Sequence, residues 1–130
     1  MLNQLSTETL EAIVDTLPVD LTFVDNNDTV RYYSKGDERI FKRSPAVIGR
    51  KVQNCHPERS LHKVEQVVGE LKSGKQDVAE FWIDLHGRKI YIRYFAVRNK
   101  AGKYLGILEV TQDITDIQQI QGEKRLLDME

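Results

Sequence analysis

The sequence has few of the residues that build disulfide scaffolds, membrane spans or nucleic-acid surfaces. Cys55 is the only cysteine among 130 residues, so no intrachain disulfide can form, which suits a reducing compartment. No apolar run reaches the roughly 20 residues that cross a bilayer, and no basic stretch followed by an apolar one marks a signal peptide. The formal net charge of -1 gives no general attraction to nucleic acid. We therefore expect a cytoplasmic protein that binds neither membranes nor nucleic acid.

The motifs of common catalytic sites are missing as well. The chain has no recognisable nucleophile–base pair, no glycine-rich phosphate loop of the Walker type and no HExxH metal motif. The glycines do not fall into a phosphate-binding pattern. We therefore expect that the protein is not an enzyme.

The order of hydrophobic patterns predicts one domain that mixes helices and strands. Hydrophobic residues make up 40% of the chain, which is enough for a core. Apolar side chains recur at helical spacing in residues 4–16 and 60–73, and Gly74 ends the second run as a C-terminal glycine. Five runs rich in aromatic and β-branched residues, typical of strands, are separated by turn residues; they are 19–25, 29–34, 77–85, 88–97 and 103–113.

Grouped strands beside grouped helices predict an α+β fold with one five-stranded antiparallel sheet. The last strand is apolar on both faces, with Ile107 on one side and Leu108 and Val110 on the other. Such a sheet must be covered on both faces. We expect the inner helices to cover one face, and the terminal helices or a second copy of the protein to cover the other. The last of these helices is predicted over residues 114–128, with Ile117, Ile120 and Leu127 on a short coiled-coil seam.

Three stretches resemble the PAS domain family. FVDNNDTVRYYS is similar to the family's opening hairpin, VIGRKVQNCHP to its "iGr … hP" segment, and YLGILEVTQDIT to its last strand with the closing motif Asp113-Ile114-Thr115. Ser34 departs from the pattern, because the family often has asparagine there. The resemblance implies an N-terminal helix over 1–17, a PAS domain over 18–115 and a C-terminal linker helix over 116–130.

The stretches CHP, DVAEFWI and LEVTQDIT … GEKRLL resemble more narrowly the PAS module of a bacterial family of unknown function, where it follows a hemerythrin-like domain. PAS domains bind small molecules between sheet and helices, or mediate pairing, and pass a shift to an attached helix. The resemblance therefore implies a sensory, homodimeric signalling module with a small-molecule ligand. A scaffold domain without a ligand and a haem-based gas or redox sensor are the alternatives.

The stretch NCHPERSLH, residues 54–62, places Cys55, His56 and His62 close together. These are too few ligands for a structural zinc site, which needs about four. One axial imidazole can hold a haem iron in an apolar pocket, and His62, on the longer helix, is the first candidate ligand, ahead of Cys55 and His56. The plainer interpretation is that Pro57 begins the helix and His56 makes a local hydrogen bond.

Glu109 is an unusual residue for the middle of a strand, because it shares a face with Ile107 that we expect to point inward. A buried carboxylate must be paired, hydrogen-bonded or protonated. One interpretation is a cross-strand pair with Arg93 at a sheet edge. The other is a ligand pocket, for which we expect a lining of six residues: Glu109, Arg93, Tyr32, Tyr91, Phe81 and Ile107.

The predicted pairing and signalling surface combines both terminal helices with the outer side of the sheet. Asp113 joins the sheet to the last helix, where it or Thr115 can act as an N-cap. A change in the sheet would then reach this helix through the joint. The predicted residues are Leu10, Ile13, Leu108, Val110, Asp113, Ile117 and Ile120.

Overall fold

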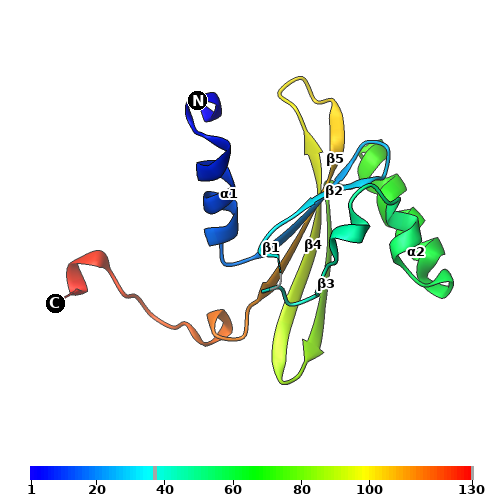
Figure 1. Ribbon diagram of the computed structural model, residues 1–130. Helices are drawn as coiled ribbons and strands as arrows, with labels where there is room; N and C mark the ends of the chain where they lie inside the picture. Colours follow the sequence, from blue (N-terminus) through cyan, green and yellow to red (C-terminus); the bar gives the residue numbers. More distant parts are fainter. Residues whose placement is uncertain (37, 130) are drawn as a thin grey trace.

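The computed structural model describes residues 1–36 and 38–129, which are arranged around a five-stranded antiparallel sheet (Figure 1). The strands lie in the order β2-β1-β5-β4-β3, which confirms the predicted fold class. The main elements are α1 (Thr7–Thr16), β1 (Asp20–Asp25), β2 (Val30–Tyr33), α2 (Glu58–Ser73), β3 (Val78–Leu85), β4 (Arg88–Arg98) and β5 (Tyr104–Asp113). Short 3-10 turns complete the described chain: η1 (Leu2–Gln4), η2 (Pro45–Val47), η3 (Val52–Cys55), η4 (Ile117–Gln119) and η5 (Leu126–Asp128).

Helix α2 covers one face of the sheet, here called the inner face. Leu71 is fully buried, and Val68 packs beside it against Val24, Val30 and Ile107 of the sheet. The helix begins at Glu58, two residues before the predicted start, because Pro57 is the N-cap. Ser60 does not cap it; its hydroxyl donates to the Pro57 carbonyl at 3.0 Å. Gly74 ends the helix in a left-handed conformation with φ of 84°, as predicted.

Helix α1 lies on the other side of the sheet from α2, beside the face here called the outer face (Figure 1). Ser6 caps it by accepting a hydrogen bond from the Thr9 amide at 3.1 Å. Asp15 accepts a hydrogen bond from the Lys35 amide at 2.9 Å and ties the helix to the end of the first hairpin. No residue of α1 is buried, and Ile13 remains 47% exposed. The helix is therefore attached to the sheet without completing a second core.

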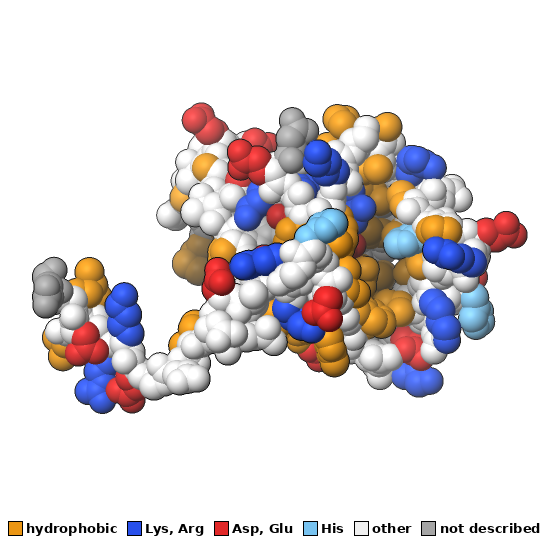
Figure 2. Space-filling model, turned by 90° about the horizontal axis from the view of Figure 1, so that it is seen from below, with side chains coloured by type: hydrophobic (Ala, Val, Ile, Leu, Met, Phe, Trp, Pro, Cys, Tyr) orange, Lys and Arg blue, Asp and Glu red, His pale blue; other side chains and the backbone are white. Residues whose placement is uncertain are grey.

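The predicted C-terminal helix over 114–128 is wrong. The described residues beyond β5 form only the turns η4 and η5, on a tail that extends away from the body (Figures 1 and 2). Gly122 has a φ of 62°, which interrupts helical geometry. The seam residues Ile120 and Leu127 are 73% and 91% exposed, so no packing offsets the cost of ordering a short helix. A coiled-coil seam needs a second helix to pack against, and a single chain supplies none.

The segment between β2 and α2 is anchored to β1 by buried polar groups. The Arg39 guanidinium donates to the carbonyls of Leu21 at 3.0 Å and Ser34 at 2.7 Å, and to the Thr22 hydroxyl at 3.0 Å. The fully buried Ser34 accepts a hydrogen bond from the Leu21 amide at 2.8 Å through its hydroxyl. Ser34 therefore helps to hold this segment, at the position where the PAS pattern often has asparagine.

Candidate functional site

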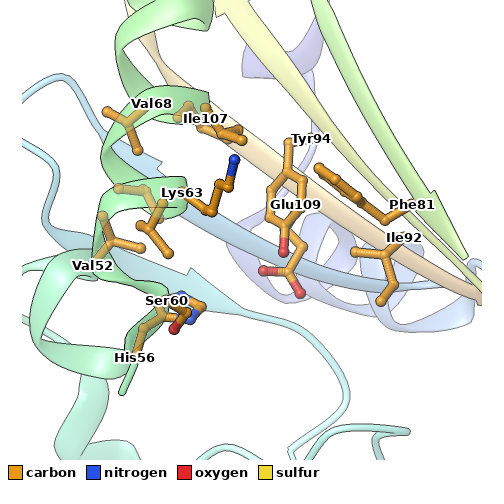
Figure 3. A pocket seen from close by; sticks show the side chains of 13 residues that line it. Val52, His56, Ser60, Lys63, Val68, Phe81, Ile92, Tyr94, Ile107 and Glu109 are labelled. Carbon is orange, nitrogen blue, oxygen red and sulfur yellow. The ribbon is translucent and has the colours of Figure 1, made fainter. Parts of the chain in front are cut away.

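A cavity of about 250 Å³ lies between α2, η3 and the inner face of the sheet. Figure 2 shows a hollow lined by hydrophobic side chains on one side of the molecule, and Figure 3 shows the lining from close by. Most of the lining is aliphatic or aromatic, contributed by Val24, Val52, Val64, Val67, Val68, Phe81, Ile92 and Ile107. This composition is typical of pockets for small, largely apolar ligands, and the volume is near their lower limit.

A few polar side chains interrupt this apolar wall. Glu109 and Tyr94 enter from the sheet, where they are direct cross-strand neighbours on β5 and β4. His56, Ser60 and Lys63 enter from the start of α2 and the turn before it. In Figure 3 the polar groups of Tyr94 and Glu109 lie on the sheet side, opposite the helix that carries Ser60 and Lys63. The cavity thus combines an apolar interior with a small number of groups that can orient a ligand.

The partner of Glu109 is Arg43, which comes from the segment between β2 and α2. One guanidinium nitrogen of Arg43 lies 3.4 Å from both carboxylate oxygens, and the Thr111 hydroxyl donates to the carboxylate at 3.3 Å. The side chains of Arg43 and Glu109 are 27% and 16% exposed. The Arg39 network holds the preceding residues against β1 and so directs Arg43 over the carboxylate. The contacts are long, so the pair neutralises charge without a tight bidentate geometry.

Burial changes the titration of two groups at the cavity. Burial raises the pKa of the Tyr94 hydroxyl, and the nearby Glu109 charge raises it further, so this phenol stays protonated. His56 lies at the rim, where desolvation lowers its pKa below the usual 6.5; Glu109 opposes this effect and Arg43 adds to it. His56 is therefore neutral at pH 7 and carries one N–H donor.

Three of the six predicted ligand residues, Glu109, Phe81 and Ile107, line the cavity. The other three, Arg93, Tyr91 and Tyr32, lie on the outer face. Arg93 pairs with Val110 in the β4–β5 register, so the predicted Arg93–Glu109 pair is wrong. A shift of one residue in register exchanges the two faces of a strand, and this is the error that placed Arg93 and Tyr91 inward. Tyr32 pairs with Phe23 of β1 and lies near Glu11 and Asp15 of α1, whose charges contribute to raising its pKa after burial.

The stretch NCHPERSLH splits between the cavity and the surface. All three residues are exposed; His56 lines the rim of the cavity, whereas Cys55 and His62 do not. The Cys55 thiol donates weakly to the Lys51 carbonyl at 3.6 Å. Among the described residues, no group of three or more histidine, cysteine or acidic side chains is arranged to hold a metal ion. Pro57 is the N-cap of α2, in accord with the plainer interpretation.

The cavity is too small for haem. A cavity of ~150 Å³ lined by apolar side chains holds one benzene molecule, so about 250 Å³ holds roughly ten non-hydrogen atoms. A haem is several times larger than this. His62, the first candidate for an axial ligand, is not among the lining residues. The geometry therefore gives no support to the haem alternative.

The residues predicted for pairing occupy three places. Leu108 and Val110 lie on the outer face of β5, and Leu10 and Ile13 lie on α1. Ile117 and Ile120 belong to the extended tail, where they are 50% and 73% exposed. Apolar side chains therefore remain exposed on α1 and the tail, and pairing stays a prediction.

Asp113 and Thr115 do not cap a helix but join the end of β5 to the start of β4. Arg88 donates to Asp113 at 2.7 Å and to Asp116 at 3.3 Å. The Thr115 hydroxyl accepts a hydrogen bond from the Lys89 amide at 2.7 Å, and the Thr115 amide donates to Asp113 at 3.0 Å. We call these four residues (Arg88, Asp113, Thr115 and Asp116) the exit clamp. It fixes the point at which the chain leaves the sheet.

Sequence reasoning missed Arg43, Tyr94 and Lys63. Tyr94 could have been found from strand alternation, because it shares a face with Ile92 and lies opposite Glu109. Lys63 lies one residue before Val64 of the apolar α2 stripe, at a position that helical periodicity places at the edge of the covered face. Arg43 lies in an irregular segment where no periodicity applies, so the sequence carries no signal for its position.

Within residues 1–36 and 38–129, no helix combines the length and apolar character that a bilayer span requires.

The comparisons with known proteins agree on the fold. A family model described as "PAS domain" matches residues 10–115. The C-terminal domain of a Streptococcus mutans protein is 37% identical, with a TM-score of 0.84 and coverage of 90% of this chain and 91% of that one. No curated protein matches the sequence.

More distant structures show the same architecture. A PAS domain from Colwellia psychrerythraea is 17% identical, with a TM-score of 0.61 over 84% of this chain and 97% of that one. A sensory box sensor histidine kinase from Vibrio cholerae is 12% identical, with a TM-score of 0.56 over 83% and 91%. The narrower resemblance to modules that follow a hemerythrin-like domain stays a prediction. The family match and the fold together show that this chain belongs to the PAS domain family.

Proposed function

We propose that this PAS domain is a cytoplasmic sensory module that binds a small, largely apolar ligand in the cavity beneath α2 and works as a homodimer. The observation that carries the proposal is the cavity of about 250 Å³ itself, which opens to one side of the molecule and is lined by aliphatic side chains with few polar ones. A filled core would have favoured a scaffold without a ligand. Structural similarity to a sensor histidine kinase from Vibrio cholerae is consistent with a signalling role.

Binding, rather than catalysis, suits the polar groups of this cavity. Glu109 is engaged by Arg43, and the Ser60 hydroxyl donates to the Pro57 carbonyl. Neither group is therefore arranged as one half of a nucleophile–base pair, which requires the two to be hydrogen-bonded to each other.

Uncovered apolar surface supports the homodimer. Ile13 of α1 and Leu17, the C-cap of that helix, are 47% and 42% exposed, and Trp82 on the outer face of β3 is 64% exposed. Trp82 pairs with Tyr91 in the β3–β4 register on the outer face, and α1 lies on the same side of the sheet (Figure 1). A second copy that brings its own α1 and outer face would bury them, as homodimer interfaces commonly do.

Ligand binding can be tested with a neutral probe of suitable size, 1-octanol, by following methyl resonances in NMR. We expect saturable shifts at Val64, Val67 and Ile107 in the wild-type protein. Val67→Phe and Val64→Phe, which fill the cavity from α2, should each weaken binding at least about tenfold, whereas Ile48→Phe, at a 43% exposed position outside the lining, should not.

Circular dichroism establishes that each variant is folded before binding is compared. No shift in the wild-type protein would contradict the binding function, and so would equal affinity in both filled variants.

A further inference from the structure

The size of the cavity limits the ligand to a small molecule. As argued above, about 250 Å³ accommodates roughly ten non-hydrogen atoms. Eight aliphatic or aromatic side chains line most of it, so the greater part of such a molecule must be apolar. The remaining question is the chemistry of its polar end.

The charges at the cavity do not cancel. Glu109 carries one negative charge, and Arg43 offsets it at 3.4 Å. Lys63 is a second cation on the cavity wall. Salt bridges engage Lys72, Lys75 and Lys89, but within residues 1–36 and 38–129 none engages Lys63. One positive charge is therefore left over beside an apolar interior, where it favours an anionic group.

The side chain of Lys63 places this charge at the cavity. It extends from α2 into the space between helix and sheet, and its nitrogen points away from His56 and Ser60 at the start of α2 (Figure 3). His56 instead lies within reach of the charges of Glu109 and Arg43. The group left to meet an anion away from Glu109 is therefore Lys63.

From this arrangement we infer that the ligand is an amphipathic monocarboxylate of about ten non-hydrogen atoms, with its carboxylate at Lys63 and its apolar part against the aliphatic side chains of the lining. The inference rests on the proposed binding function and specifies its ligand class. Glu109 would repel a carboxylate placed next to it. The carboxylate therefore lies on the α2 side of the cavity, away from the Arg43–Glu109 pair on the sheet side.

The experiment compares three probes with the same aliphatic chain: octanoate, 1-octanol and octylammonium. Their dissociation constants are measured by NMR titration at pH 7 and low salt, below the concentrations at which they form micelles. We expect octanoate to bind about tenfold more tightly than 1-octanol, because a hydrogen bond to a charged donor is worth this much. Octylammonium should bind more weakly than 1-octanol, and added salt should weaken octanoate alone.

Two lysine variants locate the carboxylate. Lys63→Met keeps the length of the side chain and removes its charge, so octanoate should lose its advantage while 1-octanol binds as before. Lys75→Met makes the same change in net charge at an exposed position after α2 and should leave the advantage in place. An octanoate advantage that survives Lys63→Met would overturn the assigned position of the carboxylate.

The remaining outcomes separate this inference from the proposed function. If 1-octanol binds as tightly as octanoate, the inference that the ligand carries a carboxylate is wrong and the binding function stands. If octylammonium binds most tightly, Glu109 rather than Lys63 selects the ligand, and the inference is again overturned. If none of the three probes binds, the ligand class and the binding function fail together.

Discussion

The two faces of the sheet are made by alternate residues of the same strands, yet they have different surroundings. The inner face is covered by α2 and by the segment that carries Arg43, and the cover leaves a cavity. Among the elements within residues 1–36 and 38–129, the outer face has only α1 beside it (Figure 1), and no residue of α1 is buried. Both faces are rich in apolar side chains, so burial within one chain does not follow from apolar pattern alone. It depends on which elements the chain has available as cover.

Charged side chains on the two faces have different kinds of partner. On the inner face Glu109 meets a cation from another segment, at 3.4 Å. On the outer face the Arg93 guanidinium lies over the rings of Tyr91 and Phe95, at 4.6 Å and 5.5 Å, and donates to Gln112 at 3.2 Å. The first arrangement confines a polar group inside the fold. The second lets a cation lie flat on an aromatic surface that remains available to another molecule.

The strongest test of the difference between the two faces is to remove one large side chain from each. Leu71→Ala deletes a fully buried side chain of α2 that packs on the inner face and should lower the free energy of unfolding by about 3 kcal/mol. Trp82→Ala removes a 64% exposed side chain from the outer face and should cost less than about 1 kcal/mol in the monomer. Urea unfolding at low protein concentration measures both. Equal losses would show that the outer face has a core of its own.

Association tests whether the outer side is completed by a second copy. We expect the wild-type protein to be a dimer at tens of micromolar in size-exclusion chromatography with light scattering. Ile13→Glu places a charge on the exposed stripe of α1 and should weaken the dimer at least about tenfold, because a charge in an apolar interface is desolvated without a partner. Ile48→Glu makes the same substitution at a similarly exposed position in the segment before α2 and is the control. A wild-type monomer at high micromolar concentration would contradict pairing.

The smallest expected effect concerns the charges around His56. Its pKa lies below 6.5 because of desolvation, with Glu109 raising it and Arg43 lowering it. Arg43→Gln should therefore raise the pKa of His56, and Glu109→Gln should lower it further. An NMR titration of the imidazole measures both directions. Shifts of the same sign in both variants would show that the Arg43–Glu109 pair does not face this rim.

The sequence was sufficient for the order of α1, α2 and the five strands, because each strand and α2 has a clear period. β3 and β4 begin or end within one residue of the predicted limits, and Gly74 ends α2 as expected. Glu109 was identified correctly as an inward carboxylate because the alternation in β5 is regular. The faces of β4 were assigned wrongly, since aromatic, aliphatic and basic residues occur on both sides of that strand and a shift of one residue changes every contact.

Two features depended on information that the sequence does not contain. Arg43 and Glu109 are 66 residues apart in the sequence. The Arg39 hydrogen bonds that position Arg43 also belong to an irregular segment. The expected C-terminal helix has an apolar seam, but helix formation in a short segment depends on tertiary contacts that this chain alone does not make.

The exit clamp has a consequence for how a signal could leave the domain. Arg88, followed by Thr115, lowers the pKa of Asp113 to about 2, so its carboxylate remains ionised throughout the physiological range of acidity. Mild acidification therefore cannot release the joint by protonating it. The Arg88–Asp113 and Lys89–Thr115 hydrogen bonds tie the start of the tail to the first residues of β4. The connection between sheet and tail is thus insensitive to proton concentration over that range.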